Sequence, residues 1–321
     1  MVRNALSIDV EEYFHVTAFN GCMPCQEWHK LESRVVPATK NLLSILAKHH
    51  TKATFFVVGW VARKHPGIVK VIQREGHEIA CHSYAHREIS EQSPESFRKD
   101  LRLGASILED ITGNPVKGYR APSFSITKDT LWALDVLIDE GFRYDSSIFP
   151  IHHDRYGIPK AERFPNLIQR NGHRIWEFPM STLRFMGINI PFSGGGYLRL
   201  LPLRLVSRAI MEINRRGQPA IVYVHPWEFD PRQPRVPASL TTRLRHYHNI
   251  SRMGCKFERL LAAHRFAPIS EVLEHCARVA SGASVGARNP QMPSPAEDAG
   301  KSPPRRPAVA AASRDASLWW A

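Results

Sequence analysis

The chain has 321 residues, of which 43% are hydrophobic and 23% charged, and its formal net charge is +13. That length accommodates one large core or two smaller ones, and the positive charge suits an acidic partner such as a nucleic acid, an anionic lipid or an acidic polysaccharide. Because lysine and arginine are scattered and no basic run is interleaved with aromatic residues, nucleic-acid recognition is disfavoured, and the most apolar stretch, residues 53–62, is too short to cross a bilayer.

The N-terminal residues do not have the composition of a signal peptide. Asp9, Glu11 and Glu12 lie where such a peptide needs an uninterrupted apolar region. The five cysteines, at positions 22, 25, 81, 255 and 276, are an odd number in a chain too large to need disulfide staples, so we expect free thiols in a reducing compartment. We therefore expect a cytoplasmic protein, with peripheral association with the inner membrane or with a membrane-bound assembly complex as a variant.

Short apolar runs alternate with helical patterns over most of the chain. The runs that predict buried strands are residues 5–10, 53–58, 77–80, 116–119, 142–144, 174–178 and 220–224. Helices are expected from Ser93-Pro94, from Thr127 up to Gly141, and over residues 202–216. The alternation predicts an α/β fold with a parallel sheet, and about seven repeats favour a single distorted (β/α) barrel over an open sheet.

Residues 281–321 differ in composition from the rest. They are rich in Pro, Ala, Ser and Arg and have no apolar periodicity before Leu318-Trp319-Trp320. Such a segment buries too little apolar surface to offset the entropy of ordering it, so we expect a disordered tail and a folded domain over residues 1–280. For the terminal tryptophans two interpretations stay open, a docking peptide or an unselected tail.

Five predicted strands end in, or directly before, a charged or imidazole side chain. These side chains are Asp9, His82, Arg120, Asp145 and His225. In β/α barrels the carboxyl ends of the strands meet at one rim, where catalytic groups gather. We therefore expect these five residues to lie near one another.

His82 and His86 are four residues apart, so over one helical turn both imidazoles would reach a single ion. Taken alone, in a chain with 16 histidines, they are better interpreted as two surface or core histidines. A metalloprotease HExxH pattern begins at His77-Glu78, but the next histidine, His82, follows His77 by five residues instead of four, so that interpretation fails.

Asp9 and Glu11 are two residues apart at a strand end, so their carboxylates point to the same side. A catalytic zinc ion takes three protein ligands and leaves one position for water. One carboxylate can then be a ligand while the other takes a proton from the water. Glu12 is interpreted as an ordinary solvated loop residue.

In chain order, Asp-x-Glu (9–11), His-Ser-x-x-His (82–86), Arg-Ala-Pro (120–122), Tyr-Asp-Ser-Ser (144–147) and Val-His-Pro (224–226) resemble the five motifs of the polysaccharide deacetylase family. This family is also called NodB-homology or carbohydrate esterase family 4. The resemblance covers roughly residues 5–230, and GHEIACHSYAH (76–86) is its most specific element. PFSGGGY (191–197) and VHPWEFDP (224–231) are similar to deacetylases encoded with exopolysaccharide and exosortase loci, so a family-specific extension is expected from about residue 190.

The resemblance implies a NodB-like barrel and a divalent metal ion held by His82 and His86. Many members have two adjacent aspartates in the first motif, the second of which binds metal, whereas Val10 occupies that position here. A subgroup has Asp-x-Asp, so Glu11 is the expected third ligand, with Glu12 or a bridging water as alternatives. Zinc is the expected ion, and Co, Ni, Mn and Fe are the alternatives.

For proton transfer, the resemblance implies that Asp9 is the general base and His225 the general acid. Arg120 would orient Asp9, and Asp145 would be the acid partner of His225. A structural role for Arg120, bridging strand ends in a loop, is the alternative.

Three further residues are candidates for substrate binding. A backbone N–H near Ser123 or Phe124 is expected to hold an oxyanion. Phe124 and Trp227 are expected to offer aromatic faces to a sugar ring, with ordinary packing at the rim as the alternative. Gly194, Gly195 and Gly196 lack a phosphate-loop context and are interpreted as a turn approaching the cleft.

The implied reaction removes N-acetyl groups from a sugar polymer or its lipid-linked precursor, in exopolysaccharide biosynthesis. Two rivals stay open: an allantoinase-like hydrolase of a small amide with the same fold, and a barrel that binds sugar without catalysis. The presence of Asp9 and His225 argues against the second rival, because binding alone needs neither a base nor an acid. The oligomeric state is not predicted.

Overall fold

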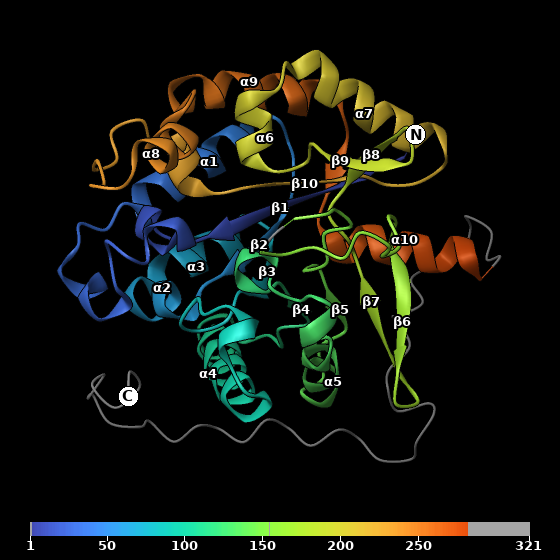
Figure 1. Cartoon of the computed structure of the whole chain (residues 1–321), viewed down its shortest axis with the longest axis horizontal. Helices are drawn as coiled ribbons and strands as arrows, with labels where there is room; N and C mark the ends of the chain where they lie inside the picture. The colour runs from blue at the N-terminus through green and yellow to red at the C-terminus, as the bar shows by residue number, and fades with distance from the viewer. Residues whose placement is uncertain (1, 154, 282–321) are drawn as a thin grey trace.

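The computed structural model describes residues 2–153 and 155–281, which form a curled parallel sheet with helices around it (Figure 1). Seven parallel strands lie in the order β10-β1-β2-β3-β4-β5-β7. Their bounds are β1 Asn4–Val10, β2 Thr54–Val57, β3 Glu78–Cys81, β4 Gly118–Tyr119, β5 Tyr144–Asp145, β7 His173–Glu177 and β10 Ile221–Val224. β6 (Asn166–Arg170) pairs antiparallel with β7, and β11 (Phe266–Ala267) pairs with the first residues of β1.

Each of the seven predicted strands overlaps one of these parallel strands, so the α/β class and the curled, barrel-like sheet are confirmed. Within the described residues the strand path does not close, because β10 and β7 do not pair. The segment 178–194 lies between them instead. There the Ile221 N–H donates to Ser181 Oγ at 2.8 Å and the Tyr223 N–H donates to the Ser193 carbonyl at 3.0 Å.

Ten α-helices lie in the described part of the chain, on both sides of the sheet as drawn in Figure 1. They are α1 Val35–Lys48, α2 Gly59–Lys64, α3 Pro66–Arg74, α4 Pro94–Thr112, α5 Trp132–Asp139, α6 Gly195–Leu200, α7 Leu203–Arg215, α8 Leu240–Tyr247, α9 Ile250–Ala263 and α10 Ile269–Ala280. α4 begins as predicted, with Ser93 Oγ accepting the Ser96 N–H at 3.2 Å. The helix predicted from Thr127 begins later, at Trp132, because Thr127 and Thr130 cap a short 3-10 turn instead.

The side chains of β1 alternate between two environments. Leu6, Ile8 and Val10 pack in the large core cluster beneath the helices. Ala5 points to the opposite face, where a smaller apolar cluster includes Phe56, and Asp9 shares that face because side chains in a strand alternate. This period of two places Asp9 inside the curl of the sheet.

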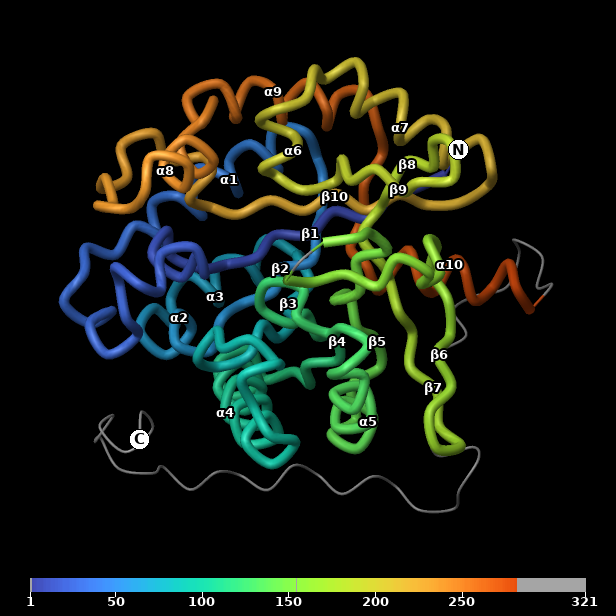
Figure 2. Tube along the Cα trace, in the orientation of Figure 1, coloured from blue at the N-terminus to red at the C-terminus, as the bar shows by residue number. Residues whose placement is uncertain are grey.

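A separate two-stranded hairpin was not predicted. It consists of β8 (Thr182–Phe185) and β9 (Ile188–Pro191), paired antiparallel. The Cα trace in Figure 2 shows this hairpin next to α7, on the side of the sheet away from α4 and α5. It forms part of the surface treated below.

All five cysteines are free, as expected. No helix among the described residues has both the length and the apolar character needed to cross a membrane. Of the predicted disordered tail, residues 282–321 lie outside the described residues, as does the terminal tryptophan pair.

Candidate active site

The polar residues predicted at the strand ends meet at one rim of the sheet. Asp9 is the penultimate residue of β1 and Glu11 directly follows that strand. His82, Arg120 and His225 directly follow β3, β4 and β10. All five residues are buried or nearly so. Buried charged groups are costly unless they are paired, so their contacts decide what the rim can do.

Glu11, His82 and His86 form a group that could hold a metal ion. One donor atom from each lies within 4.8 Å of the other two. His86 Nε2 is 2.7 Å from Glu11 Oε2. His82 Nδ1 lies 2.7 Å from the Arg120 carbonyl oxygen and donates to it, which leaves Nε2 as the free donor of an electron pair. Two imidazoles and a carboxylate are a common ligand set for zinc.

The two histidines come together in a loop, not on the helical turn that their spacing predicted. Ser83 and His86 have positive φ angles of 60° and 52°. The loop is held by Asp100 of α4, whose carboxylate accepts the N–H groups of Tyr84 and Ala85 at 2.8 and 3.0 Å. The prediction of a helical turn was therefore wrong, although the pair it placed together does share one site.

The carboxylate of Glu11 is held in its ionised form. Burial opposes ionisation, but the charges of His86, His225 and His82 lower the pKa of Glu11 well below its usual value. The indole N–H of Trp227 also donates to Glu11 Oε1 at 3.0 Å. An ionised carboxylate is the form that binds a cation.

Glu12 is not the solvated residue that we expected. It is fully buried, and its carboxylate accepts the N–H groups of Arg34 and Val35 at 2.9 and 3.1 Å. Those bonds satisfy donors at the start of α1, so Glu12 is occupied as a helix cap and is not the alternative metal ligand.

Asp9 is paired with Arg120, whose side chain is fully buried. Arg120 Nη1 lies 2.7 Å from Asp9 Oδ1, and the same nitrogen donates to Ser7 Oγ at 2.8 Å. The other two guanidinium nitrogens donate to the carbonyl and the hydroxyl of Ser146, both at 2.9 Å. The arginine therefore fixes one oxygen of Asp9, and the contact matches the orienting role that the resemblance implied.

His225 is the most exposed of these side chains, at 18%. Its Nε2 lies 3.9 Å from Asp9 Oδ2 and 3.7 Å from Glu11 Oε1, so it faces the same space as the base. Burial would lower the pKa of His225, but the charges of Glu11, Glu228 and Asp9 and the hydrogen bond to Glu228 raise it to about 9. A protonated imidazole is thereby available at neutral pH.

The carboxylate partner of His225 is Glu228, and the expected partnership with Asp145 is wrong. His225 Nδ1 lies 3.2 Å from Glu228 Oε2, which also accepts the His225 N–H at 3.0 Å. Glu228 is in turn paired with Arg199 at 2.9 Å, and a Cβ on Gly195 would lie only 1.7 Å from Glu228 Oε2. Only a glycine at that position leaves room for the carboxylate.

Asp145 instead supports the loop that follows Arg120. Its carboxylate accepts the Ser147 hydroxyl at 2.5 Å, and Ser147 Oγ accepts the Ala121 N–H at 2.7 Å. Burial raises the pKa of both Asp145 and its carboxyl neighbour Glu177, and the charge of Asp145 raises the pKa of Glu177 further. A carboxylate with these partners is engaged away from His225.

Of the expected substrate-binding residues, Ser123 stays a candidate and Phe124 does not. The Phe124 N–H donates to the Ala121 carbonyl at 3.2 Å, which leaves Ser123 as the candidate oxyanion donor. Phe124 is buried against Phe149 and Tyr223, with ring centroids 5.6 and 4.9 Å away. It therefore packs into the rim and does not present a face to a sugar.

Trp227 is 6% exposed, and its ring stacks on His225 and His246 with centroids 5.0 and 4.3 Å away. The expected sugar-stacking role is therefore wrong, because rings already cover the indole. Trp227 positions Glu11 and His225 instead.

Two site residues were missed in the sequence. Glu228 follows His225 by three residues, a spacing that allowed a contact, but the strand-end pattern drew attention to Asp145. His15 is fully buried and stacks on His86 with ring centroids 5.6 Å apart. No sequence pattern predicted this position of His15, because its place beside His86 depends on how the loop after β1 folds back.

Two family models match the chain. The polysaccharide deacetylase model matches residues 32–138, and one described as a domain of unknown function (DUF3473) matches residues 146–274. His82, His86 and Arg120 lie in the first segment and His225 and Glu228 in the second.

Curated relatives match a similar length of chain. The peptidoglycan-N-acetylglucosamine deacetylase of Bacillus cereus is 36% identical over 98 residues, which are 30% of this chain and 36% of that protein. The peptidoglycan deacetylase of Helicobacter pylori is 29% identical over 114 residues, 36% of this chain and 37% of that protein. The chain thus spans little more than a third of the length of these relatives.

Two solved structures share the fold over most of the chain. A Mycobacterium smegmatis protein described as a polysaccharide deacetylase aligns with a TM-score of 0.58 and 19% identity, covering 91% of this chain and 95% of that one. PuuE allantoinase aligns with a TM-score of 0.55 and 14% identity, covering 85% and 89%. At these identities the likeness shows the curled α/β fold alone.

Proposed function

We propose that the protein is a hydrolase that removes N-acetyl groups from an N-acetylated glycan, because residues 32–138 match the polysaccharide deacetylase family model. The observation that carries this proposal is the rim itself. Three donors for a metal ion lie beside an arginine-held carboxylate and a histidine whose pKa is raised to about 9. Amide hydrolysis needs these components together: an activated water, a base and an acid.

The donor set of Glu11, His82 and His86 fits a divalent cation, and we propose zinc. Glu11 is ionised, His82 has its second ring nitrogen engaged by a carbonyl, and three protein ligands leave a position open. When bound, such an ion supplies a water of lowered pKa and polarises the acetyl carbonyl.

Asp9 is proposed as the general base. Arg120 holds Asp9 Oδ1, so Oδ2 is the oxygen that takes the proton from the attacking water. The oxygen of the acetyl group that gains negative charge would be met by the Ser123 N–H, at a turn with a φ of 53°. The strained backbone there is a feature of functional sites.

His225 is proposed as the general acid. Its Nε2 faces Asp9 and Glu11, and Glu228 holds the opposite nitrogen, so the proton on Nε2 is directed at the substrate side. That proton would pass to the leaving sugar amine. Arg199 positions Glu228 and does not itself contact the reacting atoms.

For the substrate we propose an N-acetylated sugar polymer or its lipid-linked precursor, in exopolysaccharide biosynthesis. The support is the similarity of residues 191–197 and 224–231 to deacetylases of exopolysaccharide loci. We propose a cytoplasmic location on the ground that all five thiols are free, which suits a reducing compartment. Residues 1–280 are proposed as one catalytic domain, because β1, near the N-terminus, pairs with β10 and β11 from the C-terminal part of the domain.

A hydrolase of a small amide is the second candidate, favoured by the shared fold with PuuE allantoinase. Both candidates would use the same rim, so only the substrate separates them. Acetate release from a panel of N-acetylated glycans and small amides makes that distinction.

The test compares zinc-loaded wild type with Asp9→Asn and His82→Ala, and with His173→Ala as a matched control on the exposed surface. We expect acetate from a glycan, loss of it in the first two variants, and no change in the control. Acetate release that is unchanged in both Asp9→Asn and His82→Ala would contradict the proposed mechanism. Ammonia or ring-opened product from a small amide, without acetate from any glycan, would move the assignment to the second candidate.

A further inference from the structure

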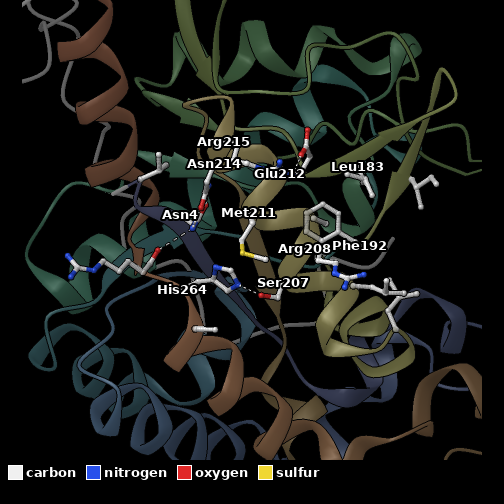
Figure 3. Close-up of a pocket in the computed structure, with 17 residues that line it drawn as sticks. Asn4, Leu183, Phe192, Ser207, Arg208, Met211, Glu212, Asn214, Arg215 and His264 are labelled. Carbon is white, nitrogen blue, oxygen red and sulfur yellow. Dashed lines mark hydrogen bonds and ion pairs between the residues drawn. The ribbon is translucent and has the colours of Figure 1, made fainter.

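The end of the molecule opposite the rim carries an apolar cavity of about 1270 Å³. It lies between α7, the β8–β9 hairpin and the first residues of β1 (Figure 3). Met211 points into its centre, and Leu183 and Phe192 lie on one side. Asn4 lines this cavity and Asp9 lines the rim, so the two sites are five residues apart on β1, or roughly 17 Å in an extended strand.

The hairpin that walls this cavity ends in exposed apolar side chains. Phe185, Met186 and Ile188 form its tip and are 59%, 85% and 67% exposed. On α7 the cavity continues into Leu205 and Met211, which are also exposed. A contiguous exposed apolar patch marks a site that binds another protein, a membrane or an apolar ligand.

Arginines surround these apolar groups. Arg208, Arg215 and Arg265 line the cavity, and Arg184 and Arg204 lie exposed on the hairpin and on α7. Among the described residues, Glu212 is the one acidic residue of the cavity wall, and it is paired with Arg215 and Arg216.

The positive charge extends to the half-buried neighbour of the hairpin, Arg163. Burial lowers the pKa of Arg163, and the charges of Arg216 and Arg184 lower it further. Arginines outnumber carboxylates among the described residues of this surface, so it carries a net positive charge next to exposed apolar side chains.

We infer that this hairpin–α7 face, defined as residues 183–190, 204, 205, 208, 211 and 215, docks on a membrane surface that contains anionic lipid. The tip of the hairpin would enter the boundary between head groups and acyl chains, and the arginines would pair with lipid phosphates. The cavity behind the tip has the apolar lining that an acyl chain needs.

Charge decides between this partner and a second copy of the chain. A two-fold contact through the same face would bring the arginines of two copies together, and their mutual repulsion opposes the contact. An anionic lipid surface supplies the opposite charge and the apolar medium at once. A soluble acidic protein would pair with the arginines but would not cover the three apolar side chains exposed at the tip of the hairpin.

The inference stands apart from the proposed activity. Because the rim and the hairpin–α7 face lie at opposite ends of β1, docking leaves the rim turned away from the lipid. A variant of the face should therefore lose membrane binding and keep acetate release. If the proposed activity is wrong, binding to vesicles is still measurable by itself.

The test is co-sedimentation of the full chain with vesicles of phosphatidylcholine alone and of phosphatidylcholine with phosphatidylglycerol in equal parts. We expect binding to the second only, weakened by salt. Phe185→Ser/Met186→Ser/Ile188→Ser should lower the partition coefficient at least about tenfold, since three large side chains lose their apolar contact. Arg204→Gln/Arg208→Gln should lower it about tenfold, through lost attraction to the phosphates.

Leu240→Ser/Leu244→Ser is the matched control, because both leucines are exposed on α8, away from the hairpin. It should bind vesicles like wild type. Equal binding to both vesicle types, or full binding by the hairpin variant, would overturn the inference. So would a dimer in sedimentation velocity that the hairpin variant abolishes, combined with no vesicle binding by wild type, because the second copy would then be the partner.

Discussion

The two ends of the sheet invert the usual distribution of side chains in different ways. At the rim, charged residues are inside: Arg120 is fully buried and Asp9 is 2% exposed. At the hairpin–α7 face, apolar residues are outside, as with Met186 at 85%. Neither arrangement favours folding: burying a charge costs free energy unless the charge is paired, and an exposed apolar side chain contributes no free energy of burial. The rim is thus built for chemistry and the opposite face for contact.

The two histidines that flank β3 are both buried, but one has a structural role and the other a role in the candidate site. His77 precedes β3 and His82 follows it, both are buried, and burial lowers the pKa of each to about 4. His77 Nδ1 accepts the Ala53 N–H at 3.2 Å, which is a structural bond. His82 Nδ1 meets a carbonyl, so its other nitrogen is free for a ligand. The hydrogen-bond partner, and not burial, separates the two roles.

The largest expected effect is at the rim. Asp9→Asn should lower kcat for acetate release by about 10²- to 10⁴-fold, because an amide cannot take the proton from water. Zinc content should not change, since Asp9 is not among the three donors. Steady-state kinetics with metal analysis checks this, and a variant that keeps its rate would remove Asp9 from the base role.

Glu228→Gln tests which carboxylate serves His225. We expect kcat/KM to fall roughly 10- to 100-fold, the effect of losing a charge-assisted hydrogen bond. The alkaline limb of the pH profile should also move to lower pH, because Glu228 helps to raise the pKa of His225 to about 9. Asp145→Asn, the matched control, should leave that limb in place; the reverse result would restore Asp145 as the partner.

His77 should affect stability at acid pH and leave catalysis alone. In the folded chain the pKa of His77 is about 4, against about 6.5 when unfolded, so the unfolded chain binds more protons between these values. Stability due to this group is therefore complete above pH 6.5 and is lost as the pH falls toward 4.

His77→Asn keeps an acceptor for the Ala53 N–H and removes the titration. The loss of stability between pH 6.5 and 4 should be smaller in this variant by about 1–3 kcal/mol, measured by urea unfolding. Parallel pH curves for the two proteins would contradict the expectation.

The smallest effect is expected at the opposite end. Met211 is 47% exposed in the cavity wall, so Met211→Gln should change the free energy of unfolding by less than about 0.5 kcal/mol. Acetate release should match wild type. A large loss of either would mean that the cavity is part of the folded core, and the contrast between the two ends would fail.

Much of the fold could be predicted because it is written in local patterns. Apolar runs of strand length located all seven parallel strands, and Ser93-Pro94 located the start of α4. The β8–β9 hairpin escaped prediction although apolar and polar residues alternate in TLRF (182–185) and INIP (188–191), because each strand has only four residues. Its shape depends on packing beside α7, which no local pattern contains.

At the rim too, some features could be predicted from the sequence and others could not. Strand ends predicted that Asp9, Arg120 and His225 would lie near one another, since parallel strands share an edge, and the structure brings them together. The same rule placed Asp145 at that edge, where it is found, but could not say which way its carboxylate turns. Ser147 and Glu177 engage it there.

By itself the sequence determined the α/β class, the run of strands and the residue types gathered at one rim, because periodicity and strand ends depend on near neighbours. Only the tertiary structure decided that Glu228 serves His225, that Glu12 caps α1 and that Trp227 is covered by rings. It also decided that the apolar tip of the hairpin and the arginines of α7 share one face. Such choices depend on side-chain direction and on space left by distant segments, as Gly195 leaves room for Glu228.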